Sequence, residues 1–91
     1  MLQTGLELIL PVVNMNGTSR EELIEQRRHQ LDWLRAALGA FRNAVPHARD
    51  WQTDPQRGYT KAREIHARRV TLLNKIKNEI EEEAFLLSKE S

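Results

Sequence analysis

Two long segments with helical spacing of apolar residues, separated by a proline-containing connector, constrain this chain more than any other feature. The first spans residues 18–45 and the second spans residues 55–88. In both, apolar side chains recur three or four positions apart, which places them on one stripe of an α-helix. Pro46 disfavours helical geometry at the preceding residue, so the first helix is expected to end by Val45.

A mainly α fold follows, in which the two helices form a long antiparallel hairpin. A connector as short as residues 46–54 leaves consecutive helices side by side. With 91 residues the chain forms one domain, 1–91, with a frayed tail at 89–91. A register centred on the connector places Arg20 near Glu83 and Phe41 beside Ala62.

The start of the first helix carries the strongest local signal. Asn16 and Gly17 are turn residues, and Thr18 or Ser19 can cap the helix, each with a Glu three positions on. Such a start leaves backbone N–H groups beside two hydroxyls at the positive end of the helix dipole, which suits an anion. The alternative is a well-capped helix with no ligand.

The second helix has its own start signal. Asp54 can cap it and Pro55 stands at its first position. Gly58 weakens that first turn, so the regular helix is expected to begin nearer Thr60.

Residues 1–17 are predicted to form an extended arm or strand. Leu6, Leu8, Leu10 and Val12 alternate with other residues, which is the period of a half-buried strand. Pro11 confines such a strand to a sheet edge. A lone strand is unstable in water, so the arm must lie on helices or pair with another copy of the chain.

Two features predict a homo-oligomer, either an antiparallel dimer or a larger assembly. The first helix has a second seam beside its apolar stripe, rich in alanine and suited to a second neighbour: Gln26, Gln30, Trp33, Ala37, Ala40 and Ala44. Charge is also divided unevenly, because residues 35–77 carry ten positive and three negative side chains, whereas residues 1–34 and 78–91 are both net acidic. Antiparallel packing of two hairpins would set basic ends against acidic ends.

The connector offers groups that suit a nucleotide-like ligand. Arg49 can bind phosphate in a fork, Trp51 or Tyr59 can stack on a base, and Asp50 can hydrogen-bond to a ribose or base edge. The alternative is a local Arg49–Asp50 ion pair with Trp51 plugging the hairpin. Arg69 lies near the seam and is predicted to be a partly buried cation that needs an acid or a ligand.

No pattern in the sequence identifies a reaction, a cofactor or a metal site. The three histidines lack metal-ligand spacing, and no phosphate loop or nucleophile elbow occurs.

The basic side chains of the second helix spread around it, so nucleic acid is not the expected partner. The apolar run before Asn14 is too short for a membrane span and lacks a basic start, so no membrane association is expected and the cytoplasm is the expected location.

Residues Val13–Gln26 resemble the opening of small uncharacterised proteins encoded by tailed bacteriophages. Those proteins also carry a Pro-x-x-Arg-Asp-aromatic connector, matched here by Pro46, Arg49, Asp50 and Trp51, and then a helix like Thr60–Leu87. The chain departs from them in its residues before Leu8 and in having tryptophan where tyrosine is expected. Small oligomeric phage proteins include sponges that sequester the nucleotide signals of CBASS and Thoeris defences, which is similar in strategy rather than in motif.

The sequence therefore predicts a non-enzymatic binding protein of the host cytoplasm, whose oligomer sequesters a small anionic, nucleotide-like ligand between subunits. The alternative is a helical interaction or assembly module without a ligand. The predicted ligand-binding residues are Asn16, Gly17, Thr18, Ser19, Arg49, Asp50, Trp51, Tyr59 and Arg69.

Overall fold

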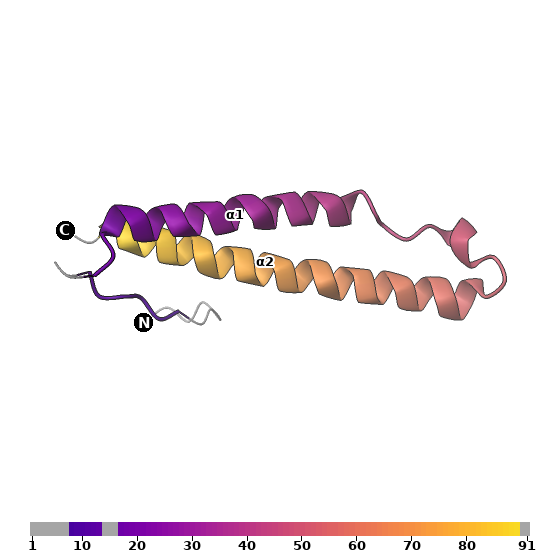
Figure 1. The fold of residues 1–91 in the computed structure, drawn as a ribbon. Helices are drawn as coiled ribbons and strands as arrows, with labels where there is room; N and C mark the ends of the chain where they lie inside the picture. Colours follow the sequence, from indigo (N-terminus) through magenta and orange to yellow (C-terminus); the bar gives the residue numbers. More distant parts are fainter. Residues whose placement is uncertain (1–7, 14–16, 90–91) are drawn as a thin grey trace.

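A computed structural model describes residues 8–13 and 17–89 of the chain. Helix α1 spans Arg20–Arg42 and helix α2 spans Thr60–Lys89, and the two run antiparallel side by side (Figure 1). Between them lie a 3₁₀ turn, η1 (Ala48–Trp51), and a π turn, η2 (Pro55–Tyr59). The result is a rod of 62 × 28 × 17 Å, so the predicted mainly helical hairpin is observed.

Helix α1 begins at the predicted capping motif. Ser19 is extended and its hydroxyl accepts a hydrogen bond from the Glu22 N–H at 3.2 Å. This bond satisfies one of the N–H groups that have no partner inside the helix, and Glu21 and Glu22 complement the helix dipole. Ser19, rather than Thr18, is therefore the cap.

The hairpin core is narrow. Among the described residues, the buried hydrophobic side chains are Leu23, Leu31 and Leu38 of α1 and Leu87 of α2. The three α1 leucines follow a spacing of seven to eight residues, so they lie along the single line of α1 that faces α2. A two-helix rod has no third element to cover its other sides, which leaves large apolar side chains exposed.

The register differs from the predicted one by about one turn at the connector end and about two turns at the start of α1. Glu83 is bound by Arg27, with 3.1 Å between Nε and Oε1, and not by Arg20. Phe41 contacts the ring of His66 at 5.9 Å between centroids, rather than lying beside Ala62. The chain is extended at His47, and an extended residue advances about 3.3 Å against about 1.5 Å in a helix. The connector therefore runs along a greater length of α2 than a helical segment with the same number of residues would.

The described part of the N-terminal arm, residues 8–13, contains no strand, so of the two predicted forms the strand is not observed there, and its pairing with another copy stays a prediction. Leu8 and Leu10 are half-buried, but Val12 is 84% exposed, which breaks the alternation at Pro11. Proline lacks the N–H that a ladder needs, and no neighbouring strand is available in this part of the chain. The segment forms an irregular arm at the start of α1 (Figure 1).

Candidate ligand site

The connector is organised around the contact between Trp51 and Gly58. A Cβ atom built on Gly58 would overlap Cδ1 of the Trp51 ring, so only glycine permits this approach. The Gly58 N–H donates to the Asp54 carbonyl at 2.9 Å, which closes the turn beneath the ring. Tyr59, the next residue, tilts against Trp51 at 6.3 Å between centroids. The two aromatic residues predicted for ligand stacking are thus neighbours in space.

A hollow of about 340 Å³ opens beside this aromatic pair. It lies where the connector meets both helices, and its lining combines apolar side chains with one histidine and one arginine: Phe41, Ala44, Pro46, Trp51, Ala62, Ile65, His66 and Arg69. The fold therefore brings together two predicted site residues, Trp51 and Arg69, that are distant in the sequence. No carboxylate lines this hollow among the described residues.

Arg69 is exposed, which corrects the prediction of a partly buried cation. The line of α2 that faces α1 passes through His66, and a residue three positions later lies to the side of that line. Arg69 consequently lines the hollow from its solvent side. It has no hydrogen bond or ion pair to any described residue.

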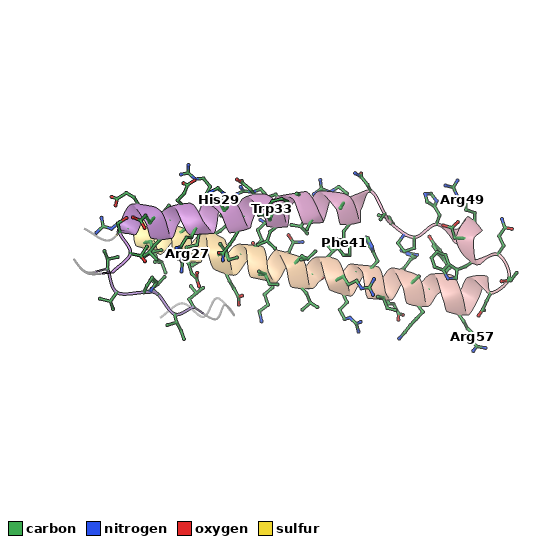
Figure 2. All side chains as sticks on the ribbon, in the orientation of Figure 1. Arg27, His29, Trp33, Phe41, Arg49 and Arg57 are labelled. Carbon is green, nitrogen blue, oxygen red and sulfur yellow. The ribbon has the colours of Figure 1, made fainter. Side chains whose placement is uncertain are left out.

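Arg49 and Asp50 are both exposed on η1. No ion pair joins them, and neither side chain has a partner in the described part of the chain. The Asp50 backbone N–H donates to the His47 carbonyl at 3.0 Å, which holds η1 in its turn. Figure 2 shows Arg49 pointing away from the connector, with Arg57 on the opposite side of the same end.

Tyr59, at the end of η2, faces a cation from the first turn of α2. The guanidinium carbon of Arg63 lies 5.6 Å from the centre of the Tyr59 ring. This cation–π contact holds the ring in place, and it adds a positive charge beside the aromatic pair.

The start of α1 forms the other predicted half of the site. Gly17 and Thr18 are exposed, the Ser19 hydroxyl already accepts its capping hydrogen bond, and Asn16 lies outside the described residues. Arg20, which was predicted only to lie near Glu83, has its Nε shielded from solvent without a hydrogen-bond partner in the part of the chain that the structure describes. Its spacing of eleven residues from Leu31 places it on the core side of α1, and that signal was present in the sequence.

The two halves lie at opposite ends of one chain. Helix α1 has 23 residues and is therefore about 34 Å long, and the connector extends beyond it (Figure 1). A single copy cannot bring Arg49 to Ser19. A shared site would need a second copy.

His47 is exposed, and its carbonyl accepts a hydrogen bond from the Asp50 N–H. No group of three histidine, aspartate or glutamate side chains could hold a metal ion within residues 8–13 and 17–89. In the same residues, no helix is long and apolar enough to cross a membrane.

Comparison with known proteins returns no match to a family model, to a curated protein or to a solved structure. The resemblance to tailed-phage proteins stays a prediction. The function has to be argued from the geometry.

Proposed function

We propose that this chain is a non-enzymatic protein that binds a small anionic, nucleotide-like ligand at its connector end. The observation that carries the proposal is the arrangement around Trp51. Arg69 of α2 lines the hollow beside Trp51, Arg49 is exposed two residues before Trp51 on η1, and neither arginine has a partner among the described residues. An arginine without a partner is available to a phosphate, because its planar fork matches two phosphate oxygens.

The aromatic pair supplies the second requirement of a nucleotide site. Trp51 is braced from below by Gly58 and from the side by Tyr59, so its ring is positioned before any ligand arrives. A base can stack on such a ring with little loss of conformational entropy. The exposed Asp50 carboxylate can accept a hydrogen bond from a ribose hydroxyl or a base amine.

A homo-oligomer completes the proposed site. The start of α1 in a second subunit offers the Gly17, Thr18 and Ser19 backbone, and Arg20 Nε has no described partner. These donors sit at the positive end of a helix dipole, which favours a phosphate. Sequestration of a nucleotide signal, as by a phage anti-defence sponge in the host cytoplasm, is the role that this chemistry fits.

Thermal denaturation with candidate ligands tests the proposal. A ligand that binds only the folded protein stabilises it by about 2.7 kcal/mol at a concentration of 100 times Kd. We expect at least one cyclic nucleotide or ADP-ribose derivative to raise the Tm, and Arg49→Ala to remove most of that increase. Arg28→Ala is the matched control, since Arg28 is an exposed arginine on α1 far from the connector.

Failure of every tested nucleotide to shift the Tm would favour the second candidate, an interaction module without a ligand. One observation supports that candidate independently: Trp33 is 77% exposed in the middle of α1. A large exposed aromatic side chain among other apolar residues is typical of protein interfaces.

A further inference from the structure

One side of the hairpin carries an uncovered apolar surface, which we call the alanine–leucine face. Helix α1 contributes Trp33, Ala37, Ala40 and Ala44, and helix α2 contributes Ile65, Leu72 and Ile76. The large members are well exposed, with Trp33 at 77%, Leu72 at 53% and Ile76 at 44%. Within each helix these residues recur three, four or seven positions apart, so they form one stripe.

The two stripes lie on the same side of the molecule. Ala44 and Ile65 line the hollow of about 340 Å³ together with Arg69. A separate hollow of about 410 Å³ is lined by the opposite flanks of the helices, including Arg42, Val45 and Asn74. The alanine–leucine face is therefore continuous across α1 and α2.

Two contacts between the helices fix the levels of α1 and α2 along this face. Phe41 meets His66, and Arg27 meets Glu83, so the stretch between them is bracketed at both ends. Interpolation between these contacts places Ala37 level with Thr71, one residue before Leu72. Small residues of α1 thus lie beside large residues of α2 in the centre of the face.

Charge decides how a second copy would lie on this face. The connector half is basic, with Arg49, Arg57, Lys61, Arg63, Arg68 and Arg69. The opposite end of the rod is acidic, because residues 17–25 and 78–89 hold seven glutamates against two basic side chains, Arg20 and Lys89. A parallel pair would stack like charges at both ends, whereas an antiparallel pair sets each basic connector end on an acidic end.

We propose that two copies pair antiparallel through their alanine–leucine faces, about a two-fold axis that passes close to Ala37 and Leu72. Each α1 then lies on the α1 of the other copy, and each α2 on the other α2. Trp33 lies four residues before Ala37, and Ala40 lies three residues after it. In the antiparallel pair, Trp33 of one copy therefore fits over Ala40 of the second copy. A large side chain over alanine is the complementary packing that an interface requires.

The same two-fold axis brings together the two halves of the proposed ligand site. In this respect the inference rests on the proposed function. Ser19 lies eighteen residues from Ala37, which is about 27 Å along the helix. Pro55 lies seventeen residues from Leu72 in the other direction, which is about 26 Å. The connector of one copy is therefore level with the start of α1 in the other, although the axis was placed from the apolar face alone.

Single-cysteine crosslinking tests this geometry, because the natural chain has no cysteine. In the full chain, Ala37→Cys places a thiol beside its own equivalent across the axis. We expect mild oxidation to convert most of this variant to a covalent dimer. Arg35→Cys is the control, since Arg35 is exposed and lies about 200° around α1 from Ala37, and it should stay uncrosslinked at the same concentration.

Light scattering of Trp33→Glu and Arg35→Gln separates the possible failures. We expect Trp33→Glu to be a monomer at micromolar concentration and Arg35→Gln, a change outside the face, to remain a dimer, with both variants helical by circular dichroism. A natural chain that is monomeric would overturn the pairing and the shared site together. A dimer that crosslinks through Arg35→Cys, or survives Trp33→Glu, would overturn only this face, and ligand titration would still decide the proposed function.

Discussion

At the residue scale, the two glycines of the helical region have opposite surroundings. Gly58 lies under Trp51, where a Cβ atom would overlap the ring. Gly39 is inside α1, and nothing lies within 4 Å of the position where its Cβ would be. One glycine is needed for a close approach, and the other only weakens a helix.

Gly58→Ala should therefore destabilise the chain by about 1–3 kcal/mol, because the added methyl group displaces Trp51. Gly39→Ala should stabilise it by about 0.5–1 kcal/mol, because alanine has a higher helix propensity. Urea denaturation followed by circular dichroism measures both changes, and tryptophan fluorescence reports whether Trp51 has moved. Equal effects of the two substitutions would mean that the Trp51–Gly58 contact does not hold the connector.

At the element scale, the Arg27–Glu83 pair joins the start of α1 to the end of α2. Its side chains are only 15% and 19% exposed, and Arg27 also donates from Nη1 to the Leu23 carbonyl at 3.1 Å. The pair between Arg35 and Glu81 crosses the same two helices, but Arg35 is 55% exposed. Removing one partner of a shielded ion pair costs more free energy than removing one partner of an exposed pair.

Glu83→Gln should cost about 1–3 kcal/mol, because it leaves the partly buried Arg27 guanidinium without its carboxylate. Arg35→Gln is the control and should change the free energy of unfolding by about 0.5 kcal/mol or less. Both values come from urea unfolding at fixed protein concentration. A cost for Arg35→Gln as large as that for Glu83→Gln would show that the register is not held by Arg27.

At the scale of the whole molecule, a rod with four buried hydrophobic side chains among its described residues has little core of its own. Small single-layer folds gain stability by oligomerising, because association covers the apolar surface that folding leaves exposed. The exposed Trp33, Leu72 and Ile76 provide that surface.

The Tm of the natural chain should consequently rise with protein concentration, by several degrees over a hundredfold range, as mass action requires for a folded dimer. Differential scanning calorimetry at about 5 μM and about 500 μM measures this shift. Trp33→Glu provides the comparison, since a monomer shows no such dependence. A constant Tm for the natural chain would exclude an obligate oligomer.

Local chemistry in the sequence determined the elements. The positions of the helices follow from the apolar spacing, the Ser19 cap and Pro46. Because each of these signals acts over only a few residues, it can be recognised in the sequence before the tertiary structure is known. The same local signals could not decide between an arm and a strand before α1, because a strand requires a partner that the alternation of Leu8, Leu10 and Val12 does not reveal.

Only the tertiary structure decided the register and the surroundings of each candidate residue. Because the extended connector runs along part of α2, Glu83 pairs with Arg27 and not with Arg20. For the same reason Arg69 lies at the rim of the hollow that Trp51 lines. These placements depend on how far a non-helical segment reaches in space, and residue counting along a helix cannot supply that distance.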